Sequence, residues 1–191
     1  QFEIVNSPVP AEQRNLYVNP LVALENAGLK SIIGEFLSDH GPFAAIHLNN
    51  IEGLSLDVLD LKRDVPETRF VFSIHNYVPI CVNGSYYMRH KHRICNPAHT
   101  GADCFACTRA DIRSNLAEIT YERGKFGQDS SFLLSKTRWI NAFNFNQLDS
   151  DVSPDEILKF SQTATKKINE NCDSILAVSQ RVYDIAAENG F

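Results

Sequence analysis

This sequence lacks the features that mark several large classes of protein. No stretch approaches the roughly 20 apolar residues that span a membrane, and the N-terminus lacks the charged and apolar regions of a signal peptide. A Gly-x-Gly-x-x-Gly fingerprint, a P-loop and a Gly-x-Ser-x-Gly elbow are also missing. These absences argue against a nicotinamide dehydrogenase, a P-loop ATPase and an elbow-type hydrolase, and they favour a soluble, cytoplasmic protein.

The chain also lacks an excess of positive charge. Its 18 lysines and arginines are outnumbered by 23 acidic residues, which gives a net charge of -5 and a pI near 5.7. We therefore expect no nucleic-acid partner, and any contact with phosphate groups must be local. With 191 residues, 43% of them hydrophobic, the chain is long enough to bury a core without disulfide bonds.

The N-terminal part of the chain predicts a loop followed by helices. Residues 1–18 read as extended chain or loop. Asn19 and Pro20 are typical of a helix start, and Gly28 is predicted to end that helix. An amphipathic helix is predicted over 29–37, where apolar residues recur at helical spacing until Gly41 and Pro42 stop it.

The rest of the chain alternates strand and helix patterns. Short apolar runs bounded by turn residues predict buried strands at 43–48, 69–74 and 174–178. Helices are predicted at 54–61, 110–121, 132–143, 153–168 and 181–189. The start at 153 is the sharpest, because Ser153, Pro154 and Glu156 fit an N-cap, a first turn and a capping box. This alternation predicts an α/β fold with a Rossmann-like parallel sheet and helices on both faces.

Polar side chains follow the predicted strands. Ligands bind at the carboxyl ends of parallel strands, and this edge would carry His47, Asn49, Asn50, His75, Asn76 and Ser179. His75 is a candidate for function, because a histidine can exchange hydrogen bonds with a sugar hydroxyl or a phosphate near neutral pH. The alternative for His75, and the favoured interpretation for His47, is a histidine that serves the structure alone.

Four of the five cysteines lie between residues 81 and 107. Cys104 and Cys107, two residues apart, can hold a tetrahedral metal ion, and Cys81 and Cys95 would complete a structural zinc site. The alternatives are a site in which His90, His92 or His99 replaces one cysteine, and free thiols or disulfides. A redox pair fits poorly, because such a pair normally opens a helix directly after a strand.

The same segment carries a basic cluster and a glycosylation sequon. The cluster comprises Arg89, His90, Lys91, His92 and Arg93. Most such runs are solvated loops, but in a protein of negative net charge a local basic loop beside a ligand edge could hold a diphosphate. We interpret the sequon Asn83-Gly84-Ser85 as a turn.

Three segments resemble a known family. They are HLNNIEGLS at 47–55, FSIHNYVPIC at 72–81 and SILAVS at 174–179. They look like the acceptor-side domain of family 4 glycosyltransferases, whose GT-B fold has two Rossmann-like domains facing across a cleft. A subset of that family has a cysteine-rich insertion after the strand that ends in His-Asp or His-Asn. The resemblance implies that 1–191 is one Rossmann-like N-terminal domain, with its insertion at 78–108 and without the C-terminal donor-binding domain.

The resemblance also implies a function. The family transfers a sugar from a nucleotide sugar, such as a UDP- or GDP-sugar, to a saccharide or lipid-linked acceptor, with retention and without a catalytic metal. The usual setting is bacterial surface polysaccharide synthesis, in the cytoplasm, and we expect peripheral association with the inner face of the membrane. His75 would be catalytic, and any zinc would be structural. The substrate-binding residues would be His47, Asn49, Asn50, Asn76, Ser179, Arg89, Lys91 and Arg93.

A second class of function is the alternative. A non-enzymatic α/β binding module could use a structural four-cysteine metal site to anchor a partner-binding loop. In the enzyme hypothesis this domain would be inactive by itself, because it needs the C-terminal domain of the same protein. A second α/β domain with paired glutamates, encoded after Phe191, would favour the enzyme.

Overall fold

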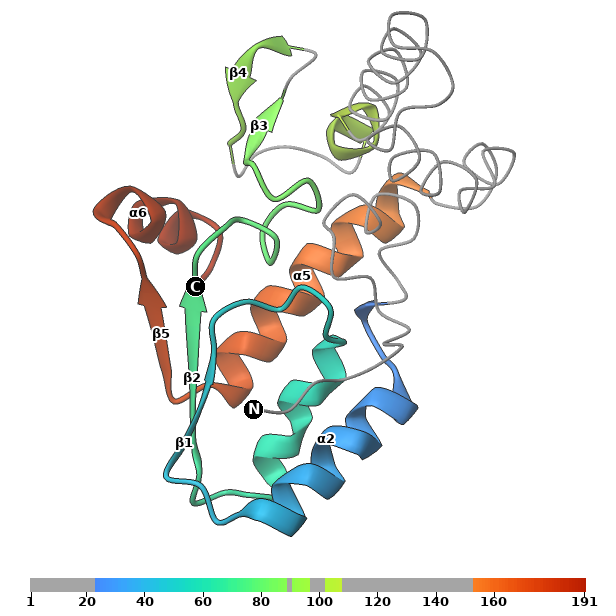
Figure 1. Cartoon of the computed structure of the whole chain (residues 1–191). Helices are drawn as coiled ribbons and strands as arrows, with labels where there is room; N and C mark the ends of the chain where they lie inside the picture. Colours follow the sequence, from blue (N-terminus) through green and yellow to red (C-terminus); the bar gives the residue numbers. More distant parts are fainter. Residues whose placement is uncertain (1–22, 89–90, 97–101, 108–152) are drawn as a thin grey trace, which may run out of the picture.

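The structure, a computed structural model, describes residues 23–88, 91–96, 102–107 and 153–191 (Figure 1). In chain order, its elements are α2 (Ala27–His40), β1 (Ala45–Leu48), the 3₁₀ helix η2 (Leu56–Arg63), β2 (Arg69–Ile74), β3 (Tyr87–Met88), β4 (Arg93–Ile94), a helical segment at 102–107, α5 (Pro154–Asn171), β5 (Ser174–Ala177) and α6 (Gln180–Glu188). Among these described elements, no helix combines the length and apolarity that crossing a membrane requires. The fold is α/β, as predicted.

Three parallel strands form the main sheet, in the order β1-β2-β5. Val71 of the central strand β2 is in register with His47 of β1 and with Ser174 of β5. The predicted parallel sheet is therefore confirmed, and β2 has the predicted bounds. The antiparallel pair β3 and β4 lies beyond the carboxyl ends of the main strands (Figure 1).

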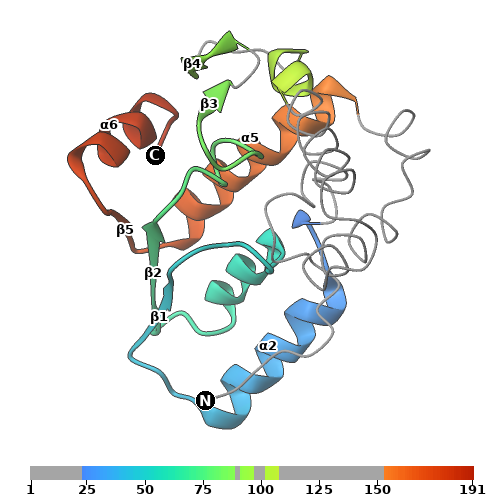
Figure 2. The same cartoon turned by 45° about the horizontal axis from the view of Figure 1, so that its top comes forward.

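One face of the sheet is buried against helices. Phe70, Phe72 and Ile74 alternate along β2 and are each at most 2% exposed. They belong to the same core cluster as Phe160 and Ile168 of α5. Figures 1 and 2 show α2, η2 and α5 together on one side of the sheet. The alternation of β2 thus determines which face the helices cover.

The opposite face is more exposed within the described residues. His47 of β1 is exposed, and Leu176 of β5 is 48% exposed. The predicted helices at 110–121 and 132–143 lie outside the described residues. Helices on both faces of the sheet therefore stay a prediction.

Helix α2 corrects one prediction about the N-terminal part of the chain. The Oδ1 atom of Asn26 accepts a hydrogen bond from the Leu29 amide at 2.9 Å, so Asn26 caps α2 and the helix begins at Ala27. Gly28 consequently lies in the first turn, and the prediction that it ends a helix was wrong. The start at Asn19 and Pro20 lies outside the described residues. The predicted stop at Gly41 is confirmed, and a Cβ there would lie 2.6 Å from the Leu37 carbonyl oxygen.

The remaining helices follow their local sequence signals. Ser153 Oγ accepts from the Glu156 amide at 3.3 Å, and Glu156 Oε2 accepts from the Ser153 amide at 2.6 Å, which confirms the capping box of α5. The helix predicted over 54–61 is present as the 3₁₀ helix η2. Lys167 of α5 and Asp60 of η2 form an ion pair at 2.5 Å, which joins these two elements.

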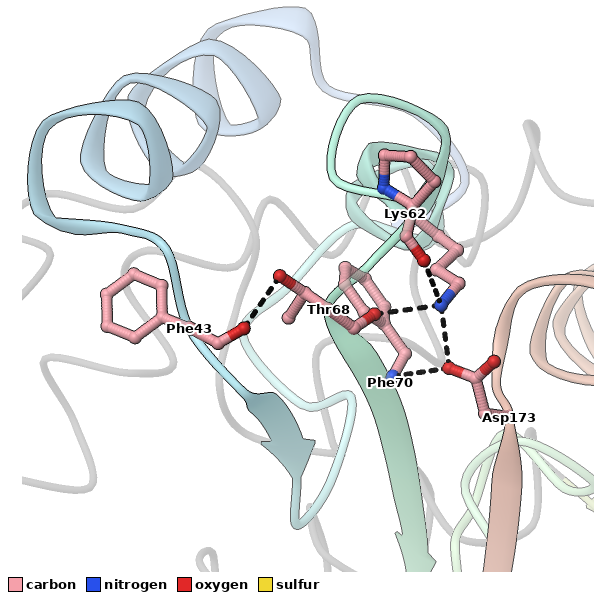
Figure 3. Close-up of polar contacts among 6 residues, drawn as sticks. Phe43, Lys62, Thr68, Phe70 and Asp173 are labelled. Carbon is pink, nitrogen blue, oxygen red and sulfur yellow. Dashed lines mark hydrogen bonds and ion pairs between the residues drawn. The ribbon is translucent and has the colours of Figure 1, made fainter.

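Lys62 and Asp173 join the amino-terminal ends of the strands (Figure 3). Lys62 Nζ donates to the carbonyl oxygens of Pro66 and Thr68 at 3.1 and 2.8 Å, and it lies 2.8 Å from Asp173 Oδ2. The same carboxylate oxygen accepts from the Phe70 amide at 2.8 Å. A lysine from η2 thus holds the start of β2 against the residue that precedes β5.

Replacing Lys62 by methionine should destabilise the protein by roughly 2 kcal/mol, the range for hydrogen bonds to charged groups. Its side chain is only 20% exposed, so water cannot fully replace its partners. Urea unfolding checks this expectation. Lys166→Met is the matched control, because Lys166 is 71% exposed and its pair with Glu170 is 3.8 Å long, and it should cost less than about 0.5 kcal/mol. Equal losses in the two variants would contradict the role of Lys62.

Asp173 should make stability depend on pH in acid. The Lys62 ammonium and then the Phe70 amide hold the pKa of the Asp173 carboxyl below its usual value of 3.8. Its contribution is therefore complete above that value and is lost as the pH falls through the lower pKa of the folded state. The gap in urea midpoint between wild type and Asp173→Asn should be constant near neutrality and should shrink in acid. A gap that stays constant through the acid range would refute this linkage.

Candidate functional site at the carboxyl edge of the sheet

The carboxyl ends of the three parallel strands meet at one edge of the sheet. Asn49 and Asn50 follow β1, His75 and Asn76 follow β2, and Ser179 lies shortly after β5. Because β2 is central, His75 and Asn76 lie between the ends of the other two strands. The structure thus brings five of the six predicted edge residues to the side where parallel sheets bind ligands.

Glu52 links the ends of β1 and β2, and sequence reasoning had assigned it no role. Its two carboxylate oxygens accept from Asn50 Nδ2 at 2.7 Å and from Asn76 Nδ2 at 3.3 Å. The Oδ1 atom of Asn76 also accepts from the Val78 amide at 3.1 Å. Gly53, with φ of 78°, follows Glu52 at the turn. The sequence offered one signal for Glu52, an acidic residue two positions after Asn50, but its second partner, Asn76 after β2, is brought close only by the pairing of β1 and β2.

His75 differs from its neighbours at this edge. Its side chain is exposed, and within the described residues it makes no hydrogen bond or ion pair. Ser179, in contrast, caps α6, because its Oγ accepts from the Val182 amide at 3.2 Å. His75 is therefore an exposed imidazole at the end of the central strand, and neither of its ring nitrogens has a hydrogen-bond partner among the described residues.

His47 lies within β1 rather than after it. Ile46 and Leu48 turn towards the core, so His47 between them points to the exposed face. Its Nε2 lies 2.7 Å from Ser73 Oγ of β2, a hydrogen bond between neighbouring strands. This contact gives His47 a partner in the structure, and it separates His47 from the strand-end groups.

Four cysteines line one small cavity in the cysteine loop, the name used here for residues 78–107. Its volume is about 20 Å³, and its lining comprises Cys81, Val82, Asn83, Tyr87, Met88, Cys95, Cys104 and Cys107. None of the five cysteines of the chain forms a disulfide. In the described part of the chain, no three His, Cys, Asp or Glu residues are arranged closely enough to hold a metal ion. His92 does not line the cavity, and His90 and His99 lie outside the described residues.

Asn83 organises this cavity. It is 4% exposed, its Nδ2 donates to Cys107 Sγ at 3.1 Å and to the Tyr87 carbonyl at 3.3 Å, and its Oδ1 accepts from Cys81 Sγ at 2.8 Å. The same Oδ1 accepts from the amide and the hydroxyl of Ser85 at 3.0 and 2.9 Å. The interpretation of the sequon as a turn is confirmed, because Asn83 is buried within it.

Burial sets the ionisation of these thiols. It raises the pKa of Cys81 to about 12, against a smaller opposing effect of the backbone at Asn83. Burial also raises the pKa of Cys95, and the backbone of Asn96 and the charges of Arg93 and Lys91 oppose it. Cys81 and Cys95 are therefore neutral and weakly nucleophilic at neutral pH, unlike a reactive redox pair.

The loop is also tied to helix α6. Tyr86 is 2% exposed and adopts a left-handed backbone with φ of 53°. Its hydroxyl accepts from Asn189 Nδ2, at the end of α6, at 3.0 Å. Its ring lies 5.4 Å from that of Tyr77, close to the end of β2. Tyr86 thus fastens the first part of the cysteine loop both to the end of α6 and to the chain that follows β2.

The structure describes three residues of the basic cluster, Lys91, His92 and Arg93. Lys91 pairs with Asp103 at 3.0 Å, and Arg93 is exposed on β4. Arg89 lies outside the described residues. Lys91 therefore already has an acidic partner within the loop, while the strand β4 presents Arg93 to solvent.

Comparisons with known proteins identify no relative from which a function could be read. No family model matches the chain, and neither a curated protein nor a solved structure matches it. What this chain does must therefore be inferred from its own residues and from the motif resemblance.

Replacing Asn83 by alanine should lower the free energy of unfolding by roughly 1 to 3 kcal/mol, because buried partners lose their hydrogen bonds. Urea unfolding in the presence of a reductant and a chelator measures this loss without any contribution from metal. Ser85→Ala is the matched control, since Ser85 is exposed and only its hydroxyl bond to Asn83 is removed. A loss for Asn83→Ala no larger than that for the control would show that Asn83 does not organise the loop.

Proposed function

We propose that this chain is the N-terminal, acceptor-side domain of a retaining glycosyltransferase of the family 4 type. The enzyme would move a sugar from a UDP- or GDP-sugar to a saccharide or lipid-linked acceptor in surface polysaccharide synthesis. The observation that carries the proposal is His75, an exposed imidazole without a partner among the described residues, at the carboxyl end of the central parallel strand. In a parallel α/β sheet this is the position where a ligand binds.

The fold supports the proposal at a coarser level. A three-stranded parallel sheet with helices packed on one face is compatible with a Rossmann-like domain, and a GT-B enzyme contains two such domains. The cysteine loop follows the strand that ends in His75, which is the order that the resemblance leads us to expect. Fold alone does not identify a reaction, so the assignment depends on the edge residues.

The edge residues have different roles in this proposal. His75 would hydrogen-bond the donor sugar and hold it while the bond between its anomeric carbon and the diphosphate breaks. The acceptor hydroxyl oxygen would form the new bond on the same face of the sugar, and the diphosphate would leave with the electron pair and take up the hydroxyl proton. Asn76 and Asn50, held in place by Glu52, would position hydroxyl groups at the edge. Asn49 is exposed beside them, and Ser179 has a hydroxyl proton left to donate.

Basic side chains of the cysteine loop would bind the diphosphate of the nucleotide sugar. Arg93 is exposed, and its guanidinium can pair with a phosphate in a bidentate manner. Lys91 would have to break its ion pair with Asp103 before it could bind a phosphate group. Arg89 belongs to the same proposed group from the sequence alone.

The second candidate is a binding module without catalysis. It is favoured by the cavity that the four cysteines share, because a clasped loop can present a surface to a partner as well as border an active site. The coding sequence after Phe191 distinguishes the two proposals. A second α/β domain with paired glutamates there supports the enzyme, and a coding sequence that stops there supports the module.

His75→Ala should reduce sugar transfer by roughly 100-fold or more if His75 stabilises the reacting sugar. The assay uses the protein as its gene encodes it, with a panel of UDP- and GDP-sugars and product detection by mass spectrometry. Stability should change by less than about 0.5 kcal/mol, because the side chain is exposed.

His40→Ala is the control for this variant. His40 is exposed at the end of α2, close to where the chain enters β1 and thus at the opposite edge of the sheet. This variant should keep wild-type turnover. Wild-type activity in His75→Ala would remove His75 from the mechanism, and the absence of any transfer by the wild-type protein would favour the module.

A further inference from the structure

The cysteine loop brings four sulfur atoms from three separate segments to one cavity. Cys81 follows the turn after β2, Cys95 directly follows β4, and Cys104 and Cys107 lie in the helical segment 102–107. Residues three apart on a helix lie on the same face, which is why Cys104 and Cys107 both line the cavity. Two later segments, the residue after β4 and the helical segment 102–107, thus come back to the turn after β2 that carries Cys81.

We propose that Cys81, Cys95, Cys104 and Cys107 bind one structural zinc ion through four thiolates. Zinc prefers tetrahedral sulfur ligands, with zinc–sulfur distances of about 2.3 Å. The cavity that the four thiols line has a volume of about 20 Å³. Because no three of the described His, Cys, Asp or Glu residues already form a ligand cluster, zinc binding requires the four thiols to move towards a common centre. Binding releases the thiol protons to solvent, and the centre then carries a net charge of about −2.

The small size of the surrounding elements explains why such a centre is needed. β3 and β4 have 2 residues each, and the helical segment spans only 102–107. Isolated hairpins and helices of this length are unstable in water. Packing holds this hairpin only in part, because Met88 is 4% exposed while Ile94 is 58% and Tyr87 36% exposed. A metal ion that joins the three segments would add to the stability that this partial packing provides.

Groups around the four sulfurs suit thiolate ligands. Asn83 Nδ2 already donates to Cys107 Sγ at 3.1 Å, and hydrogen bonds of this type orient and stabilise metal-bound sulfur. When Cys81 loses its proton, Asn83 Oδ1 keeps its two hydrogen bonds from Ser85. Arg93 adds positive charge to the hairpin that carries Cys95, which partly offsets the negative charge of the centre, whereas the charge of Lys91 is paired with Asp103. The conversion to thiolates therefore costs Asn83 Oδ1 one of its three hydrogen bonds and leaves the other two in place.

The metal content of the full chain tests the proposal without any assay of sugar transfer. Protein expressed with added zinc sulfate and purified under reducing conditions without chelators should contain about one zinc per chain by elemental analysis. After removal of the zinc, titration with cobalt chloride should produce the visible absorption of tetrahedral cobalt bound to thiolates. The result is independent of whether the enzyme proposal holds.

Three variants separate metal ligation from a general structural role. Cys95→Ser should lose most of the zinc, whereas Cys95→His should keep it, because imidazole is also a zinc ligand. The matched control is Cys172→Ser, because Cys172 lies at the end of α5 and does not line the cavity, and this variant should keep one zinc per chain. The cobalt spectrum of Cys95→His should shift to that of a site with three sulfurs and one nitrogen.

Wild-type protein that takes up neither zinc nor cobalt, while its thiols react freely with a thiol reagent, would overturn the proposal. So would iron bound in place of zinc, or intact masses that show disulfides among the four cysteines after purification without reductant. Equal zinc contents in Cys95→Ser and wild type would exclude Cys95 as a ligand and would also refute the four-thiolate site.

Discussion

The ion pair between Lys62 and Asp173 is the constraint on which the sheet depends. Parallel strands come from distant parts of the sequence, so contacts outside the strand ladder must align their ends. Lys62 donates to the carbonyl oxygens of Pro66 and Thr68 before β2, and Asp173 Oδ2 accepts from the Phe70 amide, next to the first β2–β5 pair (Figure 3). The Asp173 amide returns a bond to the Phe70 carbonyl at 2.8 Å. The alignment of the strands at their amino-terminal ends then determines which residues lie side by side at their carboxyl ends.

The two edges of the sheet consequently differ in chemistry. At the amino edge, Lys62, Thr68 and Asp173 are occupied with the backbone and with each other. At the carboxyl edge, Glu52 occupies the amides of Asn50 and Asn76, while His75 has no partner among the described residues. A protein gains little stability from an exposed, unengaged imidazole. This contrast is why the carboxyl edge, and His75 in particular, supports a proposal about sugar chemistry.

The cysteine loop borders this edge but is built on another principle. Its short strands leave Tyr87 and Ile94 exposed, although Tyr86 and Met88 are buried. The order of the loop rests on Asn83, on the Tyr86–Asn189 bond and, in our proposal, on zinc. Metal ligation and sugar binding are thus assigned to separate residues. The metal would hold the loop in position, and His75 would contact the sugar. Zinc content and sugar transfer can therefore be measured separately in variants of the two sites.

Local signals in the sequence determined the elements, and tertiary contacts decided the site. The apolar alternation of β2 and the capping box of Ser153 and Glu156 act over a few residues, so both were predictable. The error at Gly28 arose because glycine is tolerated in a first helical turn once Asn26 supplies the cap. The grouping of the four cysteines was predicted from their spacing, whereas the role of Glu52 and the Ser73 partner of His47 depend on strand order and register. Those contacts join residues far apart in the chain, and no periodicity in the sequence encodes them.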